Sequence, residues 1–194
     1  MLQPAPRPIG LFPAHFARQP EAMVVKEHLV PMAQNDYTIK SVEGQTMFYI
    51  EAKSFSLSRR KAFMDLQGNI LFTIRKENFS IPPCYYAEDS SGKRILEVQS
   101  KFTFGSSKAV CSFIGVSGKR ESLFMKGNFT ASKATITDES TNAPVAMINR
   151  DIFTAREIFA GVQTYVVSVA PNVDKALIAA MCICLDERRD ERRN

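Results

Sequence analysis

Residues 176–185 read ALIAAMCICL, an uninterrupted apolar run that is followed at once by the charged tail DERRDERRN. A membrane anchor, a metal or redox site, and a buried helix could each use such a run. From Lys175 onward the chain has no Gly or Pro, so we expect a helix over about residues 172–187, beginning after Pro171. At ~1.5 Å of rise per residue, the apolar run spans only about half of a ~30 Å hydrocarbon layer, which is too short for a membrane anchor.

The predicted helix is apolar on every face along this run, and a helix of that kind must be surrounded on all sides by protein. Its two cysteines, Cys182 and Cys184, lie ~200° apart around a straight helix and cannot hold one metal ion together. Cys84 and Cys111 each stand alone in the sequence. We therefore expect buried thiols that fill space, and neither a metal nor a cofactor.

A repeat of turns precedes the apolar segment. The turn residues, which all tolerate positive φ, are Gly44, Gly68, Gly92, Gly118 and Asn142, separated by 24, 24, 26 and 24 positions. Six positions after each turn residue comes a large apolar side chain: Ile50, Ile74, Val98, Phe124 and Ile148. A second column, two positions earlier, holds Phe48, Phe72, Leu96, Ser122 and Ala146. Positions two apart share one face of a strand, so each copy predicts a tight turn followed by a half-buried strand.

Each copy has room for two strands with their turns, so the repeat predicts about ten strands. Further strands over residues 37–42 and 162–170 bring the total to about twelve. Hairpins in series close into a barrel or fold into a sandwich, and the patterns of leucine-rich repeats and propellers are absent. The apolar helix needs enclosure, which the inside of a barrel supplies. We expect a mainly β chain (α+β by count): a closed antiparallel β-barrel enclosing one hydrophobic C-terminal α-helix.

The chain of 194 residues suits one domain with a large core. Five of its ten prolines lie in the first 23 residues, which predicts a flexible Pro-rich arm over residues 1–30 and a barrel domain over residues 31–194. The arm has no apolar run of signal-peptide length, so we expect a cytoplasmic protein. The net charge of +5 permits attraction to phosphates or anionic lipids but does not require it.

Two stretches of the chain resemble the LURP-one-related family, within the superfamily of Tubby C-terminal-like domains. They are YTIKSVEGQTMFYIEAKSFSLSRRKAFMDLQGNILFTIRKENFS at residues 37–80 and YVVSVAPNVDKALIAAMCICLDE at residues 165–187. The resemblance implies a closed barrel threaded by the C-terminal helix, a fold similar to that of phospholipid scramblases. Tubby proteins bind phosphoinositide head groups through a basic surface and can pass from membranes to nuclei. The resemblance thus implies a phospholipid-binding protein that is cytoplasmic, peripheral to membranes or nuclear. The lipid-contacting motif of Tubby proteins has no clear counterpart here, so no site residue is carried over.

The sequence has no pattern typical of an enzyme. Both histidines, His15 and His28, precede the repeat, so a Ser or Cys nucleophile in the body of the chain lacks its base. No H-x-x-x-H, P-loop or G-x-G-x-x-G motif occurs. We expect no enzyme activity.

Basic residues cluster in the links and turns of the repeat. The candidates for binding a phosphorylated head group are Arg59, Arg60, Lys61, Lys93, Arg94, Lys119 and Arg120. The last four form two GKR segments, each just after a turn glycine, and stacked copies would place both on one rim of the barrel. Repeated cations on a rim attract phosphate groups or an anionic bilayer. The alternative interpretation is that charged hairpin tips only keep the protein soluble.

Two functions therefore remain open. The first is a non-enzymatic module that binds phosphoinositides or another anionic membrane surface. The second is a protein-interaction scaffold that acts through its loops and N-terminal arm without a lipid ligand. Nucleic acid fits poorly, because no strand combines stacking aromatics with basic residues and a charge of +5 is small for that role. We expect a monomer without a transmembrane segment.

Overall fold

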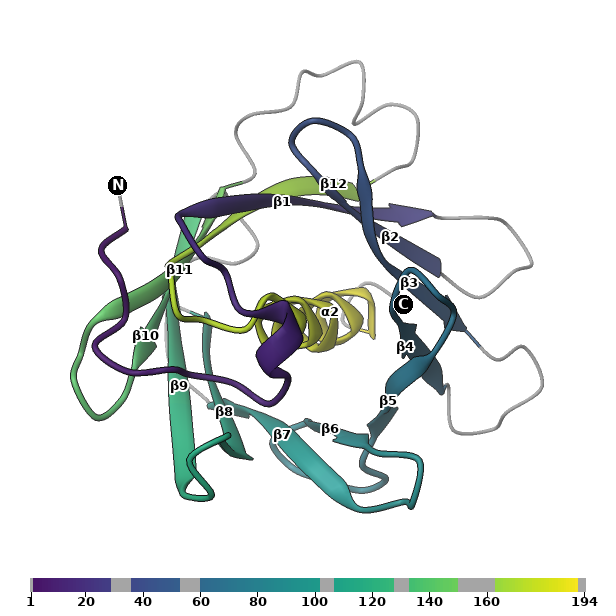
Figure 1. Cartoon of the computed structure of the whole chain (residues 1–194). Helices are drawn as coiled ribbons and strands as arrows, with labels where there is room; N and C mark the ends of the chain where they lie inside the picture. The colour runs from purple at the N-terminus through teal and green to yellow at the C-terminus, as the bar shows by residue number, and fades with distance from the viewer. Residues whose placement is uncertain are drawn as a thin grey trace.

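The computed structural model describes residues 2–28, 36–52, 60–101, 107–127, 133–149 and 163–191. Within these ranges, twelve antiparallel strands form one closed barrel around the long helix α2 (Lys175–Glu191), as the sequence predicted (Figure 1). A short 3-10 helix, η1 (Pro13–His15), precedes the barrel. The strands are β1 (Glu21–His28), β2 (Asp36–Ser41), β3 (Thr46–Ala52), β4 (Lys61–Met64), β5 (Ile70–Lys76), β6 (Cys84–Glu88), β7 (Arg94–Lys101), β8 (Ser107–Ile114), β9 (Arg120–Gly127), β10 (Lys133–Asp138), β11 (Pro144–Asn149) and β12 (Gln163–Val169).

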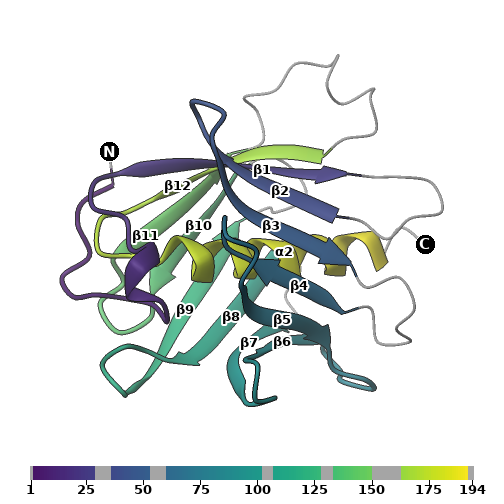
Figure 2. The same cartoon turned by 45° about the vertical axis from the view of Figure 1, so that its right-hand side comes forward.

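Each strand pairs with its neighbours in sequence, and β1 pairs with β12 to close the barrel. The connections therefore alternate between two ends (Figure 2). One end, here called the turn end, carries the tight turns 42–45, 65–69, 89–93, 115–119 and 139–143. At the opposite end, the loop end, β1, β3, β5, β7, β9 and β11 end and β2, β4, β6, β8, β10 and β12 begin.

The predicted turn residues adopt the backbone conformation for which they were singled out. The four turn glycines have φ between 73° and 86°, and Asn142 has φ 56°. A Cβ added to Gly44, Gly68, Gly92 or Gly118 would meet no atom within 4 Å, so these positions need glycine for its backbone freedom and not for space.

The fourth copy of the repeat differs from the prediction. Phe124 was expected in the apolar column, but it faces outward, and Leu123 and Met125 are buried in its place. The other four hairpins contain a register shift near the turn, as between Ile39 and Lys40, whereas β8 and β9 pair without one. One extra residue moves every following side chain to the other face of the sheet, so the missing bulge reverses the pattern in β9.

Helix α2 lies along the inside of the barrel (Figures 1 and 2). Every residue of the apolar run 176–185 is at most 3% exposed and belongs to the same core cluster as the inward side chains of the strands. The predicted enclosure is therefore confirmed, and the helix extends to Glu191, a few residues beyond the expected end. Nowhere in the described ranges is a helix both long and apolar enough to span a bilayer.

The residues before the barrel do not have the position expected of a flexible arm. Residues 2–17 lie across the turn end, where Ile9 and Ala17 are buried. The backbone N–H groups of Ala5, Ile9 and Ala17 donate to the carbonyls of Pro171, Asn172 and Val173, respectively. Strand β1 then lies between β12 and β2, so the barrel begins at residue 21 instead of residue 31. These backbone N–H groups pair with residues 171–173, just before α2, and sequence periodicity does not reveal such pairing.

Three acidic side chains, Asp174, Glu121 and Asp138, anchor this N-terminal segment. The Asp174 carboxylate accepts hydrogen bonds from the backbone N–H groups of Leu11 and Phe12, both at 2.9 Å, and from that of Ala176 at 2.8 Å. Arg7 forms ion pairs with Glu121 of β9 and with Asp138 of β10, whose side chains are 6% and 2% exposed.

Candidate functional site

The structure divides the basic residues predicted as a lipid site between the two ends of the barrel. Lys93, Arg94, Lys119 and Arg120 lie at the turn end, and Arg60 and Lys61 lie at the loop end. Arg59 lies outside the described residues. The two GKR segments share a rim, as stacking of the copies predicts, but Arg60 and Lys61 of the SRRK segment lie at the opposite end of the barrel, where β4 begins.

Lys61 and Arg94 have well-defined structural partners. The Lys61 ammonium forms an ion pair with Glu187 of α2 at 2.7 Å and lies 4.6 Å from the centre of the Tyr37 ring, with its side chain 6% exposed. The Arg94 guanidinium lies 3.9 Å from the centre of the Tyr86 ring and forms an ion pair with Glu77 at 2.9 Å. Lys61 therefore stabilises the end of the helix, and Arg94 covers the outside of β6.

A different set of cations forms a continuous row on the outer face. Lys101 of β7 is the direct cross-strand partner of Lys108 of β8, and Lys108 is the direct partner of Lys126 of β9. We call Lys101, Lys108 and Lys126 the lysine row. Their chain neighbours Ser100, Ala109 and Met125 are buried, so all three lysines point outward.

The lysine row has no charge compensation in the part of the chain that the structure describes. None of its members forms an ion pair there with a carboxylate. The Lys101 ammonium makes a cation–π contact instead, 5.9 Å from the centre of the Phe124 ring. Like charges directly opposite each other destabilise a sheet. The lysine row therefore does not stabilise this part of the sheet.

An exposed apolar loop adjoins the first member of the row. Residues 77–83, here called the apolar loop, connect β5 to β6 at the loop end and carry Phe79 and Ile81, whose side chains are 101% and 87% exposed. The N–H of Ser100 donates to the carbonyl of Pro83 at 3.2 Å, which holds the loop beside the end of β7 and hence beside Lys101.

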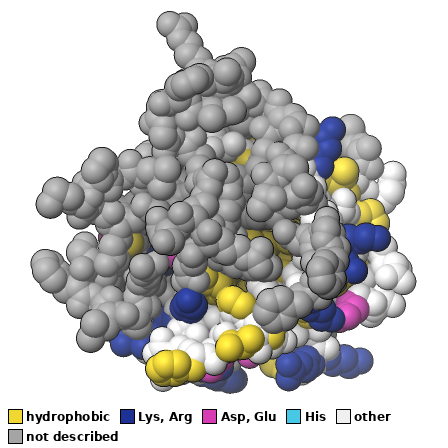
Figure 3. Space-filling model, turned by 180° about the vertical axis from the view of Figure 1, so that it is seen from behind, with side chains coloured by type: hydrophobic (Ala, Val, Ile, Leu, Met, Phe, Trp, Pro, Cys, Tyr) yellow, Lys and Arg dark blue, Asp and Glu magenta, His cyan; other side chains and the backbone are white. Residues whose placement is uncertain are grey.

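The conformation of the apolar loop is held by its own hydrogen bonds. Ser80 Oγ donates to the Glu77 carbonyl at 3.3 Å and accepts from the N–H of Cys84 at 2.9 Å. Phe79 has φ 64°, in the left-handed region that costs a bulky residue about 1 kcal/mol or more. Phe79 thus combines an unfavourable backbone conformation with a fully exposed aromatic side chain. Figure 3 views the loop end, where Lys and Arg side chains lie along the lower and right-hand margins with hydrophobic side chains between them.

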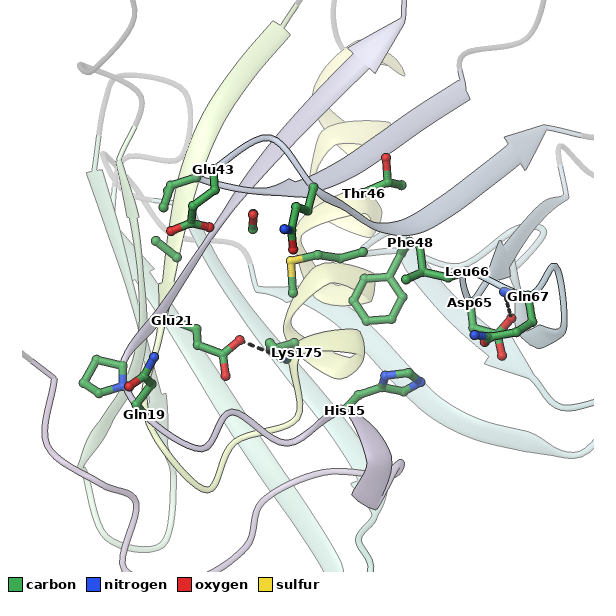
Figure 4. Close-up of a pocket in the computed structure, with 16 residues that line it drawn as sticks. His15, Gln19, Glu21, Glu43, Thr46, Phe48, Asp65, Leu66, Gln67 and Lys175 are labelled. Atoms are coloured by element: carbon green, nitrogen blue, oxygen red, sulfur yellow. Dashed lines mark hydrogen bonds and ion pairs between the residues drawn. The ribbon is translucent and has the colours of Figure 1, made fainter.

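The turn end contains a separate pocket of about 660 Å³ between η1, β1 and the turns 42–45 and 65–69 (Figure 4). Glu21 points to Lys175 and forms an ion pair with it at 2.6 Å, while the His15 ring packs edge-on against Phe48. Burial lowers the pKa of His15, so the imidazole is neutral at pH 7. The hydrogen bond from the Asn69 side chain is the main cause that lowers the pKa of Asp65.

The Glu21 and Asp65 carboxylates of the pocket are thus already paired with Lys175 and Asn69, and its imidazole is neutral. A hydrogen bond from the Ser41 side chain is the main cause that lowers the pKa of Glu43, so neither Glu43 nor Asp65 is a protonated general acid at pH 7. Burial raises the pKa of the Cys84 and Cys111 thiols to about 12, so neither is a thiolate nucleophile at neutral pH. The described part of the chain has no group of His, Cys, Asp or Glu that could hold a metal ion.

A closed barrel of twelve antiparallel strands around an apolar C-terminal helix defines a Tubby-like barrel domain. The model of the LURP-one-related family matches residues 21–186. Because this match spans most of the chain, the protein belongs to the LURP-one-related family.

The individual relatives have low sequence identity to this chain, but the similarity extends over nearly the full length of both chains. The chain is 24% identical to protein LURP-one-related 15 of Arabidopsis thaliana, over 98% of this chain and 91% of the relative. It is 20% identical to protein LURP-one-related 10 of the same plant, over 90% and 93% of the two chains. The X-ray structure of an Arabidopsis thaliana protein matches with a TM-score of 0.65 at 18% identity, covering 94% of this chain and 99% of that one, which shows the same fold.

Proposed function

We propose that this protein is a non-enzymatic module that binds membrane surfaces containing anionic phospholipids, and that it docks through its loop end. The observation that carries this proposal is the lysine row beside the apolar loop, which carries the exposed Phe79. Interfacial binding combines cations that attract lipid phosphates with apolar side chains that enter the head-group region. Anionic lipids are concentrated on the cytoplasmic leaflet, so we expect a cytoplasmic protein that binds there reversibly.

The expected affinity follows from the two parts of this surface. Each lysine near an anionic surface contributes about 1 kcal/mol, and burying a Phe side chain contributes roughly 1.5–3 kcal/mol. The sum of about 5 kcal/mol suits a protein that associates reversibly and is released by salt.

The turn-end rim remains the competing lipid face. Lys93, Lys119 and Arg120 are exposed there, as the sequence-based proposal requires. However, the Asp89 carboxylate lies in the same turn as Lys93, and its pKa is lowered mainly by the Ser91 hydroxyl and to a smaller extent by Lys93. The lysine row has no such carboxylate among its described neighbours, so we favour the loop end.

The first test removes the charge of the lysine row. The triple variant Lys101→Gln, Lys108→Gln, Lys126→Gln is expected to bind vesicles of phosphatidylcholine and phosphatidylserine about 100-fold more weakly, since about 1 kcal/mol per lysine is lost. Its unfolding free energy is expected to be unchanged or higher, because repulsion between like charges is relieved. Co-sedimentation with vesicles and urea denaturation measure the two effects. Vesicles that contain phosphoinositide in place of phosphatidylserine measure the head-group preference.

The matched control places the same charge change at the other end: Lys93→Gln, Lys119→Gln, Arg120→Gln. It is expected to bind vesicles as the unchanged protein does. Loss of binding in this variant alone would identify the turn-end rim as the lipid face. Equal and negligible sedimentation of the unchanged protein with neutral and anionic vesicles would contradict lipid binding altogether and favour a protein-interaction scaffold.

The second test separates the contact made by Phe79 from its role in folding. Phe79→Asn is expected to weaken vesicle binding by roughly tenfold, because the apolar contact is lost. Asn tolerates the left-handed conformation, so stability should be unchanged or raised. Leu66→Asn, which removes an exposed apolar side chain at the turn end, is the control and should bind normally. Unaltered vesicle binding by Phe79→Asn would show that the apolar loop does not enter the membrane.

The scaffold hypothesis assigned binding to a free N-terminal arm. Residues 5–17 are bonded to the barrel, and deleting residues 1–30 would remove β1 as well. A deletion of that size therefore tests folding instead of partner binding.

A further inference from the structure

A second feature of the outer face begins where the lysine row ends. A groove of about 850 Å³ runs over β9, β10, β11 and β12 and is lined by residues that include Phe124, Lys126, Lys133, Thr135, Met147 and Val166. None of the described residues that line it is acidic. Lys126 is therefore both the last member of the lysine row and part of the wall of the groove.

The strand register separates the polar and apolar parts of the groove. Lys126 pairs with Thr135, Thr135 with Met147, and Met147 with Ser168, so one cross-strand row leads from the lysines onto β11 and β12. In the next row, Lys133 is opposite Asn149, and Asn149 is opposite Val166.

The cations thus lie on β9 and β10, and the apolar side chains Met147 and Val166 lie on β11 and β12. Three spacings of ~4.8 Å put about 14 Å between the outermost of these strands. Met147 is 49% exposed, and a Met side chain adapts readily to a flexible apolar partner.

We propose that this groove binds one molecule of a single-chain anionic phospholipid taken from the membrane surface. Its phosphate lies at Lys126 and Lys133, its glycerol oxygens face Thr135 and Asn149, and its acyl chain lies over Met147 and Val166. Positive charge at one side, apolar side chains at the other, and continuity with the lysine row select an amphiphile with an anionic head. This inference rests on the proposed function, because it assigns a ligand to the same basic surface.

The groove has the size and composition expected for such a ligand. Sites for small molecules commonly enclose about 300–1,000 Å³ and combine apolar walls with a few polar groups that orient the ligand. Lysines act as point charges for phosphate, and hydroxyl and amide side chains supply directional hydrogen bonds.

The test uses the full chain and water-soluble probes below their micelle concentration. Titration calorimetry compares lysophosphatidic acid, glycerol 3-phosphate and lysophosphatidylcholine. Lysophosphatidic acid is expected to bind at least about tenfold more tightly than either of the others, because only it combines the charge and the chain that the groove requires. Equal affinity for glycerol 3-phosphate would show that no acyl chain is bound and would overturn the inference.

Three variants assign the two parts of the ligand. Lys126→Gln and Met147→Glu are each expected to weaken binding of lysophosphatidic acid by about tenfold or more, through lost attraction and through an added like charge respectively. Lys108→Gln, which changes a lysine of the row outside the groove, should keep this affinity within about twofold but weaken vesicle binding. Unchanged binding of lysophosphatidic acid to Met147→Glu would overturn the inference.

The same variants distinguish failure of this inference from failure of the proposed function. Vesicle binding that depends on the lysine row, together with no binding of lysophosphatidic acid, would overturn the groove assignment and leave the membrane module standing. Groove binding without any vesicle binding would overturn the membrane module and support a carrier of single lipids.

Discussion

Ala180→Asp is expected to abolish soluble expression. Ala180 is 0% exposed in the middle of α2, and the apolar run on both sides of it is enclosed by the inward side chains of the barrel. A carboxylate there would have no partner, and leaving a charge buried and unpaired costs several kcal/mol. Because a domain of this size is stable by only about 5–15 kcal/mol, one such change removes much or all of the stability.

The native Asp186 is a buried carboxylate that has the hydrogen-bond partner which an aspartate at position 180 would lack. It is 1% exposed on the same helix, but it accepts a hydrogen bond from the Tyr165 hydroxyl at 2.6 Å. Ala180→Cys is the control for position, since thiols already occupy two neighbouring sites of the run. Val42→Asp makes a similar apolar-to-acidic change at a side chain that is 57% exposed. Both controls should express in soluble form, and normal folding of Ala180→Asp would contradict the enclosed helix.

Arg7→Met is expected to lower the free energy of unfolding by about 3 kcal/mol at pH 7, because removing one partner leaves the other charges of a buried ion pair uncompensated. Arg7 is the cation for Glu121 and Asp138, which are nearly inaccessible to water. This expected loss of stability lies at the low end of the usual range for breaking a buried ion pair, because the Arg7 side chain itself is 35% exposed. Urea denaturation followed by circular dichroism measures the change.

A control and a rescue distinguish this ion-pair network from a general effect on the N-terminal segment. Arg18→Met changes an exposed arginine directly after this segment and should alter stability by less than about 0.5 kcal/mol. Adding Glu121→Gln and Asp138→Asn to Arg7→Met should restore part of the loss, because the uncompensated charges are then removed. If Arg7→Met is as stable as the unchanged protein, the N-terminal segment is not held by these pairs.

The elements that could be predicted from the sequence depend on residues that are close along the chain. Gly44, Gly68, Gly92, Gly118 and Asn142 mark their turns because a positive φ is a property of one residue. The enclosure of α2 could be predicted because ten consecutive apolar residues have no polar face in any helix. Phe124 was misplaced because a β-bulge changes the face of a strand without changing its apolar spacing.

Only part of the candidate site could be predicted from the sequence. Lys108 and Lys126 are each nine positions from Ser117 in the turn between β8 and β9, so symmetry about that turn could have paired them. Lys101 and Lys108 face each other across the connection 102–106, whose register no turn signal defines. Alternation predicts that each lysine points outward, but it cannot tell which lysines become neighbours.

A barrel of hairpins around a buried C-terminal helix follows from local patterns in the sequence, since turn conformation and helix polarity are local properties. Long-range pairing places residues 2–17 across the turn end, because their amides pair with carbonyls more than 150 positions away. It also places the predicted basic clusters at opposite ends and brings three separate lysines into one row. Those neighbours arise from pairing between strands, and the register of that pairing is set by closure of the whole barrel.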